Sequence, residues 1–240
     1  MHYFVLILLS SLLIIITGAW TWAEIITIGP QKEIQRWEQQ CLIDDHDLFN
    51  IAWERYITAN RINPVQADFL SGLGRLSLIK CCSSRQGNDV ADNQHCTQAI
   101  TYLQRALTKR PSSGLTWAYL ANALSYDPNQ SELFIIAMAR SASFEPYERL
   151  NQMQLIPLAI KHWKQLPNSL KHNMMTIIKH GLRYQPLDGS FIIEAAVKHN
   201  WSEPLKPLLL KKRQTRYWMK LSNSSGNAST NQNNSSSPKK

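Results

Sequence analysis

Residues 99–124 read AITYLQRALTKRPSSGLTWAYLANAL, and this stretch decides the fold. Ala99, Leu103 and Ala106 are separated by four and three residues, so they share one face of a helix. Pro111 follows five residues later and ends that helix, because proline lacks an N–H group and disfavours helical geometry in the residue before it. A second apolar helical face begins six residues beyond Pro111. The stretch therefore predicts two helices joined at a proline corner.

The same spacing of a small, a large, a small residue and a proline recurs along the chain. The four copies are Ala52, Tyr56, Ala59 and Pro64; Ala99, Leu103, Ala106 and Pro111; Phe134, Met138, Ser141 and Pro146; and Met174, Ile178, Gly181 and Pro186. The positions six, nine, ten and thirteen residues beyond each proline form the next helical face, as in Trp117, Leu120, Ala121 and Leu124. One such unit cannot bury its apolar face alone, so the repetition predicts a stack of helix pairs.

These faces together resemble the tetratricopeptide repeat, a helix–turn–helix unit of about 34 residues. The steps between successive prolines are 47, 35 and 40 residues, counted from position 64 to 111, to 146 and to 186. The longest step contains a polar insertion between Lys80 and Asn93, which we expect to be a loop. We expect an all-α, tetratricopeptide-like helical-hairpin solenoid over residues 31–221. The stretch from Glu203 to Leu221 would be its closing helix, and the Ser/Asn-rich residues 222–240 a disordered tail.

The N-terminal segment, residues 1–28, is predicted to be a transmembrane anchor or a signal sequence. Residues 3–16 are almost unbroken aliphatic sequence, and the first charge is Glu24. A helix over residues 3–23 would rise about 30 Å, enough to cross the hydrocarbon core of a bilayer. Trp20 and Trp22 would then lie at the interface. We favour an uncleaved single-pass helix.

Cleavage and orientation stay open at this point. Thr21 and Ala23 resemble the small residues of a cleavage site, but no Lys or Arg precedes the apolar run, as a signal peptide would require. Lys32 and Arg36 follow the span and favour a cytoplasmic location for the rest of the chain. The cysteines favour the opposite side of the membrane, so charge alone does not decide the orientation.

Four cysteines could form disulfides, remain free or bind a metal. Cys81, Cys82 and Cys96 flank the insertion, and a bond from Cys81 or Cys82 to Cys96 would close a loop of about 15 residues, worth about 3 kcal/mol. Such a bond forms only in an oxidising compartment such as the bacterial periplasm. A metal site would add His95, although adjacent cysteines suit tetrahedral ligation poorly. Cys41 is expected to be a small buried apolar residue.

The rest of the sequence favours no catalytic chemistry. It contains no phosphate-binding glycine loop, nucleophile elbow or zinc-protease motif, so we expect no enzyme, no cofactor and no metal. The acidic residues 44–47 are interpreted as a turn and a helix N-terminus. The 26 Lys and Arg residues against 17 Asp and Glu residues give a net charge of +9, which suits acidic partners, but no nucleic-acid motif accompanies it.

Residues 105–124 (RALTKRPSSGLTWAYLANAL) and the helix ending ARSASFEPYE are similar to tetratricopeptide proteins encoded with bacterial exopolysaccharide genes, specifically the VpsP-type polysaccharide-biosynthesis family. The resemblance covers about residues 45–185 and the N-terminal anchor. It implies a bacterial inner-membrane accessory protein with its repeats facing the periplasm. It also implies partner proteins in polysaccharide assembly or export, and it supplies no catalytic residues.

These observations predict a membrane-anchored scaffold that binds a partner protein on the concave surface lined by the first helix of each unit. The candidate partner-binding residues are Trp117, Tyr119, Asn122 and Tyr126, because aromatic and Asn side chains suit peptide binding. One alternative is a general adaptor for envelope protein assembly. Another is direct binding of an anionic polysaccharide by the basic surface.

Overall fold

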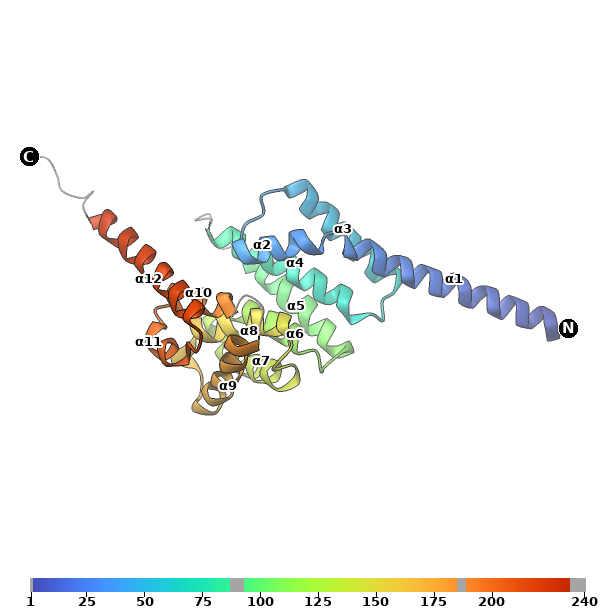
Figure 1. The fold of residues 1–240 in the computed structure, drawn as a ribbon. Helices are drawn as coiled ribbons and strands as arrows, with labels where there is room; N and C mark the ends of the chain where they lie inside the picture. The colour runs from blue at the N-terminus through green and yellow to red at the C-terminus, as the bar shows by residue number, and fades with distance from the viewer. Residues whose placement is uncertain (1, 87–92, 185–188, 234–240) are drawn as a thin grey trace, which may run out of the picture. The chain divides into compact units, whose positions relative to one another are not determined.

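The chain folds into helices throughout the part that the structure describes, and these helices form two compact units. The computed structural model describes residues 2–86, 93–184 and 189–233 (Figure 1). Within those ranges there is no strand, so the predicted all-α class is confirmed. The first unit is Met1–Phe134 and the second is Ile135–Lys240.

The helices begin and end as local chemistry dictates. In chain order they are α1 (His2–Ile28), α2 (Gln31–Gln40), α3 (His46–Ile62), α4 (Ala67–Gln86), α5 (Asn93–Lys109), α6 (Gly114–Leu124), η1 (Pro128–Gln130), α7 (Ser131–Phe144), α8 (Arg149–Lys161), η2 (Trp163–Gln165), α9 (Asn168–Tyr184), α10 (Ser190–Lys198), α11 (Ser202–Leu205), η4 (Lys206–Leu208) and α12 (Lys212–Asn233). Asp45 caps α3 by accepting a 2.8 Å hydrogen bond from the Leu48 backbone N–H, which confirms the helix N-terminus predicted in the acidic segment.

Three prolines lie at equivalent corners. α3 ends two residues before Pro64, and α4 begins three residues after it. The same offsets separate α5 and α6 around Pro111, and α7 and α8 around Pro146. Pro186 belongs to residues 185–188, which lie outside the described ranges between α9 and α10. The predicted corners are therefore confirmed at the three prolines that the structure describes.

The core of the first unit forms around α4, which packs against α3 and α5 and also contacts α2 and α6. The pattern residues that α3 and α5 contribute are all buried, namely Ala52, Tyr56, Ala59, Ala99, Leu103 and Ala106. Gly74 permits the close approach of α4 to α5, because a Cβ atom there would lie 2.5 Å from Cγ of Leu103.

The core of the second unit forms around α8 and α10. α8 packs against α9 and α10, and α10 packs against α12. Met174, Ile178 and Gly181 of the fourth sequence copy are buried on α9. Gln214 attaches α12 to this unit, because its Nε2 donates a 2.7 Å hydrogen bond to the Leu182 carbonyl oxygen.

Two predicted boundaries were wrong. α4 continues to Gln86 instead of ending at Lys80, so part of the expected loop is helix. The closing helix expected over 203–221 is interrupted, since Pro207 lies in the short helix η4 and α12 begins only at Lys212.

The N-terminal helix α1 has two different parts. The most apolar 18-residue stretch of residues 3–28 has a mean hydropathy of 2.3, and it is not buried against the rest of the chain. The helix is therefore long and apolar enough to cross a membrane. Its last turns differ, because Ala23 and Thr27 are buried and α1 packs against α3. The apolar helix thus continues without a break into the first unit.

Candidate partner-binding site

The first helices of the repeated pairs, α2, α4 and α6, share a polar centre built on an ion pair. Arg75 on α4 donates two hydrogen bonds to Glu38 on α2, from Nε to Oε1 at 2.8 Å and from Nη2 to Oε2 at 3.0 Å. The side chains are only 16% and 11% exposed. Two parallel bonds to one carboxylate fix the guanidinium plane, so this pair sets the register between α2 and α4.

Gln31 and two tyrosines complete the surroundings of the guanidinium. Arg75 Nη1 donates to Gln31 Oε1 at 3.3 Å, and Gln31 Nε2 donates to the Tyr56 hydroxyl at 2.5 Å. The Arg75 guanidinium also lies over the ring of Tyr119 on α6, 5.1 Å from its centroid. The centre therefore links side chains from α2, α3, α4 and α6.

Burial and charge fix the protonation states at this centre. Burial raises the pKa of the Tyr119 and Tyr56 hydroxyls, although Arg75 opposes the shift in both. Burial lowers the pKa of Arg75, but Glu38 and the two tyrosines together outweigh it, and the Arg75 pKa lies above its ordinary value. At neutral pH the Arg75 guanidinium is therefore charged and the two phenols are neutral.

A glycine makes room for Tyr56. A Cβ atom on Gly72 would collide with the ring of Tyr56, so the ring can lie against α4 only because residue 72 has no side chain. Beside it, the hydroxyls of Ser71, Thr116 and Ser113 form a buried chain. The Ser71–Thr116 oxygen distance is 3.2 Å and the Ser113–Thr116 distance is 2.9 Å. These hydroxyls join α4 to the N-terminus of α6.

These groups line a cavity of about 200 Å³, the size of one or two side chains. Its charged lining residues are Glu24, Asp68, Arg75 and Arg110, so the formal charges balance. Arg110 Nη2 forms an ion pair with Asp68 at 2.8 Å. A cavity with balanced charge, hydroxyls and amide groups suits a neutral polar side chain better than a strongly anionic one.

Of the four residues that the sequence suggested as partner contacts, Tyr119 does not fit that role. Tyr119 is 3% exposed and belongs to the buried centre, so the expectation that it lies on an exposed side was wrong. Its ring lies beneath the Arg75 guanidinium inside the centre.

The other three suggested contacts are half-buried. Trp117 Nε1 donates to the Pro111 carbonyl oxygen at 2.7 Å, and Arg85 lies 5.1 Å from the ring centroid of Tyr126. Asn122 lies on α6, the helix that also provides Tyr119. Only Tyr119 of the four lines the cavity, so the structure does not gather them into one site.

Sequence reasoning missed Arg75, Glu38, Gln31 and Tyr56 as a group. One feature of the sequence could have indicated this group: Arg75 is the only charged residue in the apolar run from Phe69 to Ile79. A charge inside such a run must find a partner when the helix is buried on several sides. The partner on α2 could not be identified from spacing alone, because it is 37 residues away.

All four cysteines are paired in two disulfides at one end of α4. Cys81 is bonded to Cys96 on α5 with a Cα–Cα distance of 5.0 Å, and Cys82 is bonded to Cys41 with a Cα–Cα distance of 5.5 Å. Neighbouring residues on a helix point about 100° apart, so Cys81 and Cys82 face different helices. The two bonds therefore connect α4 to α5 and to the end of α2.

The expectation for Cys41 was wrong. This residue is half-buried and disulfide-bonded, and it ends α2 in a left-handed conformation with φ of 55°. The even number of cysteines was the signal that pointed to a second bond. Because both pairs use their thiols, the metal alternative that needed Cys81, Cys82 and Cys96 loses its sulfur ligands.

Comparison with known proteins finds no matching family model, no matching curated protein and no matching solved structure. The geometry of the chain itself therefore carries the functional argument.

Proposed function

We propose that this chain is a single-pass membrane scaffold of tetratricopeptide-like hairpins that holds a partner protein on the α2–α4–α6 face. The observation that carries the proposal is the polar cavity beside Arg75, whose guanidinium is held by Glu38. Its lining is held in place by a buried ion pair and a hydroxyl chain, so a partner side chain would meet groups that are already oriented. Such preorganisation reduces the entropy lost on binding.

The location outside the cytoplasm is supported by the cysteines. Disulfides persist in oxidising compartments and are rare in the cytosol. Two of them clamp the same end of α4, and none of the four cysteines is left as a thiol. This favours the bacterial inner membrane, with the helical units on the periplasmic side, over the orientation that Lys32 and Arg36 suggested.

The pathway part of the proposal comes from the resemblance to VpsP-type proteins. It assigns the partner to a system that assembles or exports an exopolysaccharide, and the protein would act there by contact and not by sugar transfer. A general role in envelope protein assembly would use the same face. The balanced charge of the cavity favours either protein partner over direct binding of an anionic polysaccharide at this site.

The test is site-specific photocrosslinking in native membranes. A photoreactive amino acid replaces Leu115, which lines the cavity, or Thr108, which is exposed on α5 and serves as the matched control. The proposal expects a polypeptide adduct from position 115 and none from position 108. Mass spectrometry then identifies the partner and its pathway. Equal adducts from both positions, or none from position 115 in a folded protein, would overturn the proposed binding face.

A further inference from the structure

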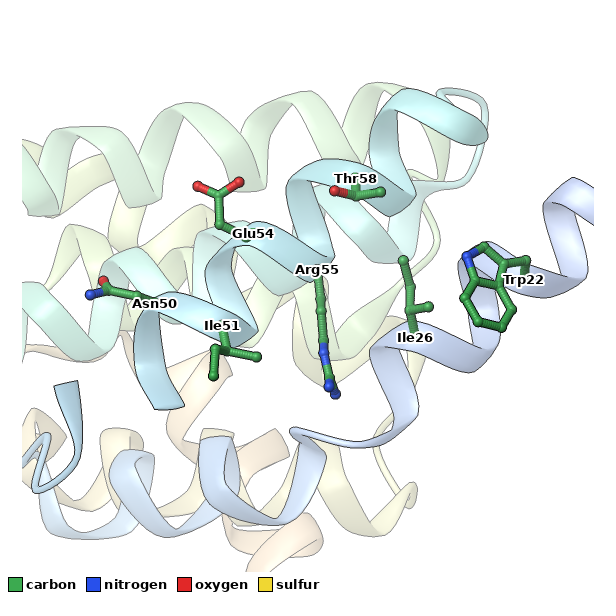
Figure 2. Close-up of a pocket in the computed structure, with 7 residues that line it drawn as sticks. All are labelled: Trp22, Ile26, Asn50, Ile51, Glu54, Arg55 and Thr58. Carbon is green, nitrogen blue, oxygen red and sulfur yellow. The ribbon is translucent and has the colours of Figure 1, made fainter. Parts of the chain in front are cut away.

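A second groove lies between the last turns of α1 and the outer side of α3. Figure 2 shows its seven lining residues, of which Trp22 and Ile26 come from α1 and Ile51 and Arg55 come from α3. The groove encloses about 450 Å³ and is mainly apolar. It is separate from the polar cavity and shares no lining residue with it.

The position of the groove follows from the length of α1. From Tyr3 to Trp22 the helix has 20 residues, which rise about 30 Å and match the hydrocarbon thickness of a bilayer. Trp22 therefore reaches the level of the headgroups when α1 spans the membrane. This step rests on the proposed anchor. Because α1 continues into the first unit as one helix, the groove opens directly beside the bilayer surface.

The walls of the groove are apolar and uncovered. Trp22 is 58% exposed and Ile51 is 48% exposed. Large apolar side chains gathered at the end of a membrane span suit the glycerol and upper acyl region of a lipid, where contact with water is avoided.

Arg55 adds a cation at the same place. A Cβ atom on Gly29 would lie 2.7 Å from Arg55 Nη1, so the guanidinium lies against the backbone at the end of α1. Among the described residues, no carboxylate pairs with Arg55. Glu54 also lines the groove, but Figure 2 shows Glu54 and Arg55 leaving α3 in opposite directions. A guanidinium in this setting matches a phosphate, which it can bind through two parallel N–H groups.

We propose that this groove binds one anionic phospholipid of the surrounding bilayer. The lipid phosphate pairs with Arg55, and its glycerol and upper acyl chains cover Ile26 and Trp22, which lie between Arg55 and the membrane span. The bound lipid would fasten α3 to the membrane surface as well as α1. A zwitterionic lipid would need a carboxylate beside Arg55, to pair with its choline group while the phosphate binds the guanidinium. No carboxylate in the groove faces Arg55, so an anionic lipid is favoured.

The test uses the full-length protein in nanodiscs of phosphatidylcholine mixed with phosphatidylglycerol. Lipids that remain bound after gentle release are counted by native mass spectrometry. Wild type should retain phosphatidylglycerol in preference to phosphatidylcholine. Arg55→Gln should lower this preference about tenfold, as expected for the loss of a charge-assisted hydrogen bond. Trp22→Ala should weaken retention without removing the charge.

The matched control is Arg105→Gln, which removes the same charge from an exposed position on α5. It should retain lipid like wild type. An equal loss in Arg105→Gln, or no preference in wild type, would overturn the lipid site. An alkaline wash of membranes separates this outcome from failure of the anchor. Protein released by the wash contradicts the proposed anchor, whereas protein that stays in the membrane without lipid preference contradicts only the groove.

Discussion

The indole Nε1 of Trp117 donates a 2.7 Å hydrogen bond to the carbonyl oxygen of Pro111, six residues earlier in the chain. Gln152 does the same at the next corner, where its Nε2 donates to the Pro146 carbonyl oxygen at 2.8 Å. The two side chains differ in size and chemistry but occupy the same position relative to the proline. Each one links the proline carbonyl to the helix that follows. The two corners therefore share one hydrogen-bond geometry, although the residues that make the bond differ.

Replacement of Trp117 by Phe should test this corner bond. The ring remains, but the donor is lost, so the free energy of unfolding should fall by about 1 kcal/mol. Urea unfolding followed by circular dichroism measures the change. Trp20→Phe is the control, since that indole is exposed on α1, lines neither the cavity nor the groove, and should leave unfolding unaltered. An unchanged midpoint for Trp117→Phe would mean that the bond contributes nothing to the corner.

The ion pair between Arg75 and Glu38 predicts a non-additive pair of variants. Arg75→Met should cost about 3 kcal/mol of unfolding free energy, because it leaves the Glu38 carboxylate largely buried without its partner. The double variant Arg75→Met with Glu38→Leu should regain much of that loss, since two apolar side chains can pack in place of the pair. Denaturant unfolding of both variants provides the measurement.

The same double variant separates stability from binding. If the polar cavity receives a partner, the folded double variant should lose the crosslink from position 115 while it keeps its helical spectrum. Single and double variants of equal stability would contradict the buried ion pair. A folded double variant that still forms the crosslink would contradict its role in recognition.

The disulfides predict a ranked effect of cysteine removal. Cys41 and Cys82 are 41 residues apart and Cys81 and Cys96 are 15 apart, so the chain-entropy model gives about 4 and about 3 kcal/mol respectively. Paired serine variants should follow that order in urea unfolding without reductant. The wild-type protein with reductant has lost both bonds, so it should be less stable than either paired serine variant measured without reductant. Equal midpoints with and without reductant would contradict both bonds.

The pairing itself is tested by mass mapping. Cys81 and Cys82 lie between Lys80 and Arg85, so trypsin leaves both on one peptide. The Cys81→Ser variant resolves this ambiguity. Its Cys41 should remain linked to the peptide that carries Cys82, and its Cys96 should become reactive to an alkylating reagent. A bond from Cys41 to Cys96 in this variant would contradict the observed arrangement.

The sequence predicted the local features of the fold more fully than its long-range contacts. The corners at Pro64, Pro111 and Pro146 follow from backbone rules that act within a few residues. The need for a small residue at Gly74 also follows from helical spacing, since that position faces the neighbouring helix. Such features depend only on residues that are close together in the sequence, so the sequence alone is sufficient to predict them.

The candidate site could be predicted only in part, because its residues come together through packing. Tyr119 was a candidate contact because aromatic side chains suit peptide binding, but it is buried beneath Arg75 from another helix. The partner of Cys82 depends on which helix lies on each side of α4. The helical period shows that Cys81 and Cys82 point in different directions, and it does not show that Cys41 lies in one of them.

Two histidines predict a loss of stability in the second unit as the pH falls. Burial lowers the pKa of His162, and a hydrogen bond with Gln165 opposes the shift. Burial also lowers the pKa of His199, with further contributions from Lys198, Lys161 and His162. Both folded-state values therefore lie below the ordinary value of about 6.5 that the unfolded chain has.

The sign of the effect follows from proton binding. Well above pH 6.5 both states are neutral at these histidines, and they add no pH dependence. As the pH falls below that value, the unfolded chain binds protons first, so unfolding becomes more favourable until the folded histidines also titrate. The melting temperature should therefore decrease from about pH 7 to about pH 5. Tryptophan fluorescence can follow the transition, because the ring centroids of Trp163 and Trp201 in this unit are 5.0 Å apart.

The double variant His162→Asn with His199→Asn should show a smaller decrease in melting temperature. His172→Asn, an exposed histidine on α9, should keep the wild-type slope. The same slope in the double variant would assign the pH dependence to other groups.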